Sequence, residues 1–246
     1  MSMMWNVFCQ GIASGAVASD CLGTAVDPSY LRWMLSAWGW SLTVALLSLI
    51  VAMLMGTVMG VLRTVPNKAL VFLSLAWTEL FRNVPLLVQV FIWYLVLPEI
   101  FPLLKAIPGF FLVVLALGFF TSARIAEQVR AGIHSLPSGQ RAAGLAMGLT
   151  LPQTYRYVLL PMALRIVIPP LTSESMNIMK NSSVAFAVSI AELTMFAMQA
   201  QEETSRGIEI YLAVTGLYFI SAFIINRLAK ILERRLSVPG MIGGGM

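Results

Sequence analysis

The sequence predicts an all-α, polytopic membrane protein with five transmembrane helices, the N-terminus outside the cell and the C-terminus inside. Of its 246 residues, 59% are hydrophobic and only 11% are Asp, Glu, Lys or Arg. A soluble domain typically carries about 25% charged residues. Long apolar runs recur along the chain, and Lys and Arg collect in alternate connections between them. A chain so poor in charge cannot cover a surface that faces water, so the bilayer is its expected solvent.

Residues 1–36 form the first predicted unit, a periplasmic N-terminal segment. It holds the only two cysteines of the chain, Cys9 and Cys21. They could pair in an oxidising compartment, but we favour reading them as two separate small apolar residues. Because the chain has no Cys-x-x-Cys spacing and a single histidine, His134, a metal site built from Cys and His is not expected.

Five apolar regions follow, and with their connections they define a transmembrane domain over residues 37–236. The regions are 38–62, 69–98, 107–123, 166–193 and 208–226. The first carries no charge and exceeds the ~20 residues that a spanning helix needs. Within it, Gly56 and Gly60 form a small-x-x-x-small face that allows another helix to approach closely.

The cations set the predicted orientation. One side of the five-span arrangement receives Arg63, Lys68, Arg130, Arg141, Arg156, Arg165, Arg227, Lys230, Arg234 and Arg235. The other side receives only Arg32, Lys105 and Arg206, together with Asp20, Asp27, Glu99, Glu192, Glu202, Glu203 and Glu209. Because Lys and Arg in short loops mark the cytoplasmic side, the first group is expected inside. Residues 237–246 are expected to be a flexible cytoplasmic tail.

The cytoplasmic loop at about residues 131–160 carries its own structural signals. Gly139 to Met147 can form a short helix, with Ser138 as a possible N-cap and Gly148 closing its C-terminal end. Thr150 and Gln153 then have the spacing of a capping box that opens a second helix. The loop therefore predicts a helix, a tight turn and another helix.

The first of these short helices has almost no side chains. Its residues, with the closing glycine, are our candidates for docking onto a partner: Gln140, Arg141, Ala142, Ala143, Gly144, Ala146 and Gly148. A helix with such small faces can sit deep in a groove of another protein. The alternative is a helical hairpin that packs against its own membrane core.

Charged residues also lie within or beside the spans, where they are functional candidates by default. Glu79 and Arg82 are three residues apart, and Arg124, Glu127 and Arg130 repeat that spacing. Residues three apart lie on one helical face. We interpret both groups as structural ion pairs that neutralise each other and fix the helix ends.

The fourth span is strongly polar and cannot face lipid on all sides. Glu174 and Lys180 lie six residues apart on different faces, so each should turn toward another helix or a watery cavity. The substrate-path candidates are Glu174, Asn177, Lys180, Asn181, Ser182 and Ser183. Lys180 is the best candidate to meet an anionic group, although a structural partner for a helix end or a carboxylate is an equal alternative.

Several stretches resemble a known family. Gln140 to Gly148, followed by Leu160-Pro161, resembles the Glu-Ala-Ala loop of importer permeases of the ATP-binding-cassette (ABC) superfamily. Other stretches, over 79–89, 127–130 and 180–183, look like the polar amino acid branch, and most like glutamate/aspartate permeases. The resemblance extends from about residue 38 to residue 235. It departs from the motif at Arg141, where the family has glutamate.

The resemblance implies a multi-pass protein of the bacterial inner membrane with a type I ABC importer-like fold. It implies a second permease subunit, identical or homologous, two cytoplasmic ABC ATPase subunits and a periplasmic amino-acid-binding protein. This chain has no Gly-x-x-x-x-Gly-Lys-Ser/Thr phosphate loop. ATP and Mg²⁺ are therefore expected on the partner ATPase, with no cofactor and no catalytic residue in this chain.

Two other classes compete with that reading. An ion-gradient-driven secondary transporter or channel would need no ATPase partner and would use the intramembrane charges for coupling. An intramembrane enzyme is not expected, because His134 lies beside no obvious nucleophile. Nucleic-acid binding is not expected either, since no basic run is interleaved with aromatic residues.

Overall fold

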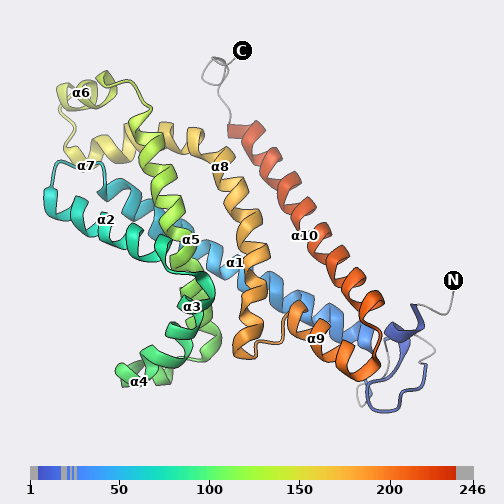
Figure 1. Ribbon diagram of the computed structural model, residues 1–246. Coiled ribbons are helices and arrows are strands. Elements are labelled where there is room, and N and C mark those ends of the chain that lie inside the picture. The colour runs from blue at the N-terminus through green and yellow to red at the C-terminus, as the bar shows by residue number, and fades with distance from the viewer. Residues whose placement is uncertain (1–4, 18–20, 23, 25–26, 237–246) are drawn as a thin grey trace.

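The computed structural model describes residues 5–17, 21–22, 24 and 27–236, and in Figure 1 they form a splayed set of helices. The four longest are α1 (Tyr30–Leu62), α5 (Gly109–His134), α8 (Leu160–Asn181) and α10 (Gly207–Leu236). The shorter ones are α2 (Lys68–Asn83), α3 (Leu86–Phe91), α4 (Leu97–Ile100), α6 (Gly139–Ala146), α7 (Leu151–Thr154) and α9 (Leu193–Thr204). The expected tail, 237–246, lies outside the described residues.

By length and composition, three helices could each cross a membrane alone: α1, α5 and α10. Two further candidates are bent pairs. The stretch 68–83 meets 86–100 at 106°, and the stretch 151–188 meets 193–204 at 53°. Counting each bent pair as one span gives up to five in the described part of the chain. The predicted all-helical membrane architecture is confirmed, and the exact count depends on the bent pairs.

The N-terminal segment differs from our expectation in two ways. Cys9 and Cys21 form a disulfide, so reading them as separate residues was wrong. Isolated β-bridges pair Gln10 with Val17 and Gly11 with Ser29, which folds the segment back on itself and brings the cysteines together. The first helix also begins at Tyr30 rather than near residue 37, because Ser29 caps it by accepting a hydrogen bond from the Arg32 N–H at 3.3 Å.

The second apolar region breaks at a proline. Val84 is extended (φ −89°, ψ 131°), as the residue before a proline usually is. The Gln89 amide then donates hydrogen bonds to the Phe81 carbonyl at 2.9 Å and to the Val84 carbonyl at 2.8 Å. Gln89 therefore satisfies carbonyls that the break leaves without helical partners.

Two π-helical turns, Ile92–Val96 and Tyr155–Leu159, have the same local cause. Each ends two residues before a proline, Pro98 or Pro161. A proline in a helix lacks an N–H and its ring collides with the carbonyl four residues earlier. A wider local turn relieves this collision.

The glycine face predicted in the first span packs against α5. A Cβ added at Gly56 would lie 2.6 Å from the Ile125 Cβ, and one at Gly60 would lie 2.6 Å from the Val129 Cβ. Both distances are too short for real side-chain contacts, so only glycine permits this approach of α1 to α5. Ile125 and Val129 belong to the main buried apolar cluster, to which α1, α5 and α8 contribute.

Gly60→Leu is expected to destabilise the protein by about 1–3 kcal/mol, because the added side chain overpacks the α1–α5 contact. Gly39→Leu, in the same helix, is the matched control, since an added Cβ there meets nothing within 4 Å. Thermal unfolding of the two purified variants in detergent measures the difference. Equal midpoints would contradict the tight packing at Gly60.

Candidate functional site

The short helix α6 lies at the same end of the molecule as the C-terminal end of α10 (Figure 1). The N-terminal segment and α9 lie at the other end. The helix spans Gly139–Ala146, close to the range that the sequence predicts. Ser138 stands at its N-cap position but makes no side-chain capping bond.

The C-terminal end of α6 is closed as the sequence predicts. Gly148 adopts φ +83°, in the left-handed region that favours glycine. Its N–H donates to the Leu145 carbonyl at 3.0 Å, and the Leu149 N–H donates to the Gly144 carbonyl at 3.2 Å. These two bonds form a Schellman motif, which fixes the direction in which the chain leaves α6.

The faces of α6 divide its small residues into two groups. Ala142, Ala143, Ala146 and Gly148 are exposed, together with the neighbouring Leu145 and Met147. Gly144 is buried, and a Cβ there would lie 2.7 Å from the Thr154 Cγ2. Gly144 therefore holds α6 against α7 and is not part of the exposed docking face we expected, whereas Gln140 and Arg141 are half-buried.

The second helix of the loop is continuous with the polar fourth span. The Thr150 N–H donates to the Gln153 Oε1 at 2.8 Å, which is one half of the predicted capping box. From Leu151 the chain is helical without interruption through the π turn to Asn181. The loop that we placed at 131–160 is thus shorter, because α5 reaches His134 and the next long helix starts at Leu151.

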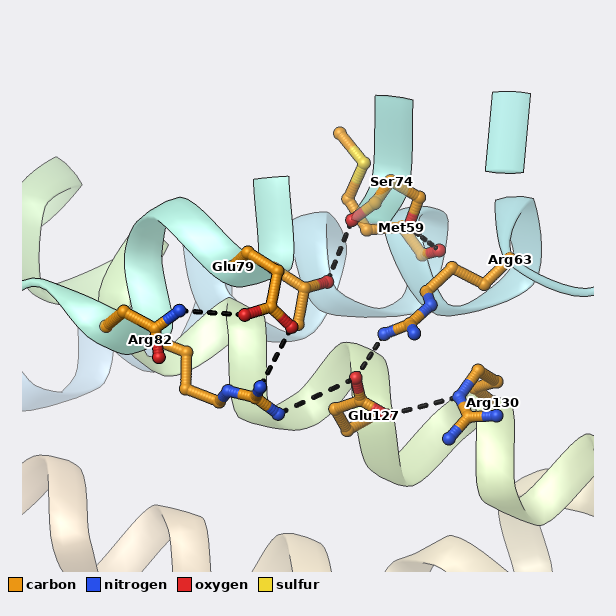
Figure 2. A network of polar contacts seen from close by, with 9 residues as sticks. Met59, Arg63, Ser74, Glu79, Arg82, Glu127 and Arg130 are labelled. Atoms are coloured by element: carbon orange, nitrogen blue, oxygen red, sulfur yellow. Dashed lines mark hydrogen bonds and ion pairs between the residues drawn. The ribbon is translucent and has the colours of Figure 1, made fainter. Parts of the chain in front are cut away.

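A cluster of charges joins α1, α2 and α5 (Figure 2). Glu127 contacts Arg63, lies 3.1 Å from the Arg130 Nε, and lies 3.9 Å from Arg82 Nη1. Arg82 also pairs with Glu79 at 2.8 Å. The predicted pairs at i, i+3 are present for Glu79–Arg82 and Glu127–Arg130, and the cluster further ties the end of α1 to both other helices.

Arg124 differs from the prediction. Its Nε lies 3.0 Å from Oε2 of Glu174 on α8 and not beside Glu127, and its guanidinium covers the Phe120 ring at 5.0 Å. Gln128 adds a hydrogen bond to the other Glu174 oxygen at 3.2 Å. The Glu174 side chain is only 8% exposed. Glu174 therefore joins α8 to α5.

The remaining polar residues of the fourth span face in several directions. Ser182 is buried and donates to the Met179 carbonyl, and Ser183 donates to the Lys180 carbonyl. Asn177 and Asn181 are half-buried. Lys180 is exposed and, among the described residues, makes no ion pair. Lys180 thus differs from Glu174 in having no fixed partner.

Lys180 lines a cavity of about 330 Å³ between the end of α8, α9 and α10. The cavity is lined by Lys180, Ser183, Thr194, Ala197, Tyr211, Val214, Thr215 and Tyr218. These side chains offer one ammonium group, several hydroxyls and an apolar floor. Such a mixture can hold a small anionic molecule that also carries hydrogen-bonding groups.

Behind that cavity lies a buried carboxylate that sequence reasoning missed. We placed Glu192 among the outer loop charges, but it is fully buried. It caps α9 by accepting hydrogen bonds from the Thr194 and Met195 N–H groups at 2.9 and 3.0 Å, and it accepts another from the Tyr218 hydroxyl at 2.9 Å. Its position directly before a helix was the available signal, since a negative charge is stabilising at a helix N-terminus.

The N-terminal segment is held by Asp27 at its far end. The Asp27 carboxylate accepts hydrogen bonds from the Ala13 N–H at 2.8 Å and the Ser14 N–H at 3.3 Å. The Ser14 side chain, followed by these backbone donors, lowers the pKa of Asp27. Nearby, the Tyr30 hydroxyl donates to Glu203 at 2.8 Å, so the acidic turn after α9 is tied to the start of α1.

No cluster of three or more His, Cys, Asp or Glu side chains that could hold a metal occurs in the part of the chain that the structure describes. The functional candidates are therefore α6 with its surroundings, and the cavity that Lys180 lines.

Residues 46–238 match the protein family described as "Binding-protein-dependent transport system inner membrane component". The glutamate/aspartate import permease protein GltJ of Escherichia coli (strain K12) is 41% identical over 99% of this chain and 100% of its own length. The probable glutamine ABC transporter permease protein GlnM of Bacillus subtilis (strain 168) is 34% identical over 80% of this chain and 89% of its own.

Two solved structures are similar in fold. A crystal structure of an amino acid ABC transporter with histidines matches with a TM-score of 0.72 and 29% identity, over 84% of this chain and 95% of that chain. An inward-facing structure of the MetNI methionine ABC transporter matches with a TM-score of 0.73 over 85% of this chain and 98% of that chain. Its identity of 21% supports the fold alone.

Proposed function

Because the chain belongs to the family of binding-protein-dependent transport system inner membrane components, we propose that it is the permease through which an ATP-driven importer moves glutamate or aspartate into a bacterial cell. The chain is an inner-membrane permease subunit of an amino acid ABC importer, with a type I importer fold. It is a transport component and not an enzyme, because ATP hydrolysis belongs to a separate subunit. The ion-gradient-driven alternative is not favoured.

The observation that carries the coupling part of this proposal is the exposed face of α6. Ala142, Ala143 and Ala146 face outward with almost no side chain, and Met147, 83% exposed, stands beside them. The Schellman motif and Gly144 fix this face to the helix that runs to Asn181. We assign α6 the docking of the cytoplasmic ATPase, so that closure of two ATPase subunits on ATP pulls on the spans.

The proposed assembly contains two permease subunits, identical or homologous, two ATPase subunits and a periplasmic amino-acid-binding protein. The binding protein delivers the amino acid to the outer mouth of the permease pair. The turn that carries Glu202, Glu203, Arg206 and Glu209 is a candidate contact for it, with a solvated loop as the alternative. The membrane domains then swing between outward-open and inward-open states.

The acidic amino acid is proposed from two lines of support. The relative aligned over the whole chain at 41% identity is a glutamate/aspartate permease. Lys180 supplies an exposed cation in a cavity with hydroxyl groups, which suits a carboxylate. Four substrate-path candidates remain proposals: Lys180, Ser183, Asn177 and Asn181. The contacts of Glu174 and Ser182 support structural roles instead.

Lys180→Gln is expected to lower the rate of glutamate uptake by at least about tenfold, because the loss of a hydrogen-bonded contact to a charged carboxylate costs about 1.5–3 kcal/mol. Lys180→Arg should retain most of the rate. Lys105→Gln is the control, because it removes a cation that pairs with Glu99 in an exposed turn. Unchanged uptake by Lys180→Gln would remove Lys180 from the path.

We further propose that each bent pair crosses the membrane once, which gives five spans with the N-terminus in the periplasm and the C-terminus in the cytoplasm. The positive-inside distribution supports this orientation. The Cys9–Cys21 disulfide also supports it, since disulfides persist in the periplasm and are rare in the cytosol. The N-terminal segment and α6 lie at opposite ends of the molecule (Figure 1), as an odd number of spans requires.

Labelling of intact cells with a membrane-impermeant maleimide tests this orientation. After treatment with an impermeant reductant, Cys9 and Cys21 should label. A cysteine introduced by Met147→Cys, in a chain whose native cysteines are replaced by serine, should label only after the cells are permeabilised. Labelling at position 147 from outside would reverse the orientation and would exclude ATPase docking at α6.

Reconstitution tests the function as a whole. Proteoliposomes that contain this permease, its partner permease where one exists, the ATPase and the binding protein should take up glutamate only with ATP inside, and vanadate should stop the uptake. Uptake by this chain alone that follows an ion gradient and resists vanadate would establish the alternative.

A further inference from the structure

A second cavity of about 330 Å³ lies at the base of α6. Its walls come from the turn after α1, the end of α5, the start of α6 and the π turn that leads into α8. The polar lining residues are Thr64, His134, Ser138, Arg141 and Tyr155. The Tyr155 hydroxyl donates to the Thr64 carbonyl at 2.7 Å, which fixes one wall. The cavity therefore lies where the ends of α1 and α5 and the start of the helix that includes α8 meet α6.

The cavity has a positively charged lining residue and no negatively charged one. Arg141 brings a permanent positive charge to it. No Asp or Glu is among the lining residues. Within the described residues, Arg141 makes no ion pair or side-chain hydrogen bond, although it is half-buried. A half-buried guanidinium in a cavity without a carboxylate lacks the acceptor that it usually has.

We propose that an aspartate or glutamate side chain of the ATPase subunit enters this cavity and pairs with Arg141. The inference rests on the proposed function, because it takes α6 as the ATPase-docking helix. It adds the chemistry of the contact: the ATPase presents an acidic side chain to the permease at this point. An ATPase with a basic residue there would be repelled by Arg141.

Continuity with the docking face favours the ATPase over a free anion. Arg141 lies on the same short helix as the exposed Ala142 and Ala143, directly before them. A partner that covers those two alanines therefore lies beside Arg141 and can reach it with a side chain. The apolar lining residues Ile133, Leu136 and Leu159 exclude water around the pair, which strengthens a charge-assisted contact.

The position of the cavity would allow one contact with the ATPase to transmit force to several helices. A side chain seated there touches the end of α5 through His134, the α1–α2 turn through Thr64, and the start of the polar helix through Tyr155. One acidic side chain of the ATPase therefore engages three spans together, whereas the alanine face engages α6 alone.

Cross-linking with a carbodiimide, which joins an amine to a carboxylate, tests the proposal in the assembled transporter. Arg141→Lys should form a link to one Asp or Glu of the ATPase, identified by mass spectrometry. Gln140→Lys is the matched control, because Gln140 does not line the cavity, and it should give at least about tenfold less of this product. Links only to carboxylates of this chain, or equal yields from both variants, would overturn the proposal.

Reversal of the charge at position 141 provides a second, independent test of the contact. Arg141→Glu should weaken ATPase association by at least about tenfold, and reversal of the cross-linked ATPase carboxylate to lysine should restore it. If millimolar glutamate on the cytoplasmic face instead inhibits ATPase activity through Arg141 and no cross-link forms, the cavity binds a free anion and the proposal is wrong. If the unmodified permease retains no ATPase at all, the proposed function fails and this contact fails with it, whereas loss of the cross-link alone overturns only the contact.

Discussion

Ala143→Arg is expected to release the ATPase from the membrane complex while the permease itself stays folded. Ala143 is exposed on α6, so a long charged side chain there meets no part of its own chain. It would instead hold the ATPase surface away from the small face of the helix. Loss of a central, closely packed contact costs about 2–4 kcal/mol, which corresponds to roughly 30- to 1,000-fold weaker association. Co-purification of the ATPase and single-turnover ATP hydrolysis in the complex measure the loss.

The matched control is Ala69→Arg, the same change at an exposed alanine near the start of α2. It should leave the complex intact, and both variants should unfold at the same temperature. Gly148→Arg is a less clean test, because φ +83° at Gly148 adds backbone strain of about 1–2 kcal/mol for any other residue. Retention of the ATPase by Ala143→Arg would count against α6 as the docking helix.

Arg124→Leu is expected to be the most destabilising single change inside the membrane domain. It would leave the Glu174 carboxylate buried without its cation, at a cost of about 3–5 kcal/mol. The thermal midpoint should fall by on the order of 10 °C. Lys105→Leu, which breaks an exposed pair with Glu99, should cost under about 1 kcal/mol.

The double variant Arg124→Leu with Glu174→Leu decides between a structural pair and a substrate site. If the two residues serve each other, removal of both should restore most of the stability lost in the single variant, because an apolar pair of similar volume replaces a buried ion pair at little cost. The double variant should also retain uptake. A stable double variant that transports nothing would return Glu174 to the substrate path.

The sequence predicted the elements that depend on neighbouring residues. Gly148 in the left-handed region, the capping residues Thr150 and Gln153, and the pair Glu79–Arg82 follow from spacings of three or four residues, which a linear reading can see. Gly56 and Gly60 were predictable for a similar reason, since four residues make about one helical turn. The helix that packs on them, α5, could not be named, because that choice depends on the tertiary arrangement.

The errors arose where partners are distant in the chain. Arg124 was assigned to Glu127, three residues away, but it forms its ion pair with Glu174 on another helix. Glu192 was read as a solvated loop charge, because the burial created by α1, α9 and α10 has no local signature. The bend at Pro85, which the proline and the Gln89 amide produce, was not predicted. The cysteines were misassigned because their proximity depends on two β-bridges.

The continuous helix from Leu151 to Asn181 joins the end of the molecule where α6 lies to the segment that carries Lys180. At ~1.5 Å per residue it is a rod of roughly 45 Å. In a rod of this length, a tilt of a few degrees at the α6 end becomes a displacement of several ångströms near Lys180. Its hydrogen-bond ladder is disturbed at the π turn Tyr155–Leu159 and at Pro169 and Pro170 inside the helix, because a proline lacks the N–H that a helix uses. Bending of the rod should therefore be concentrated at these two places.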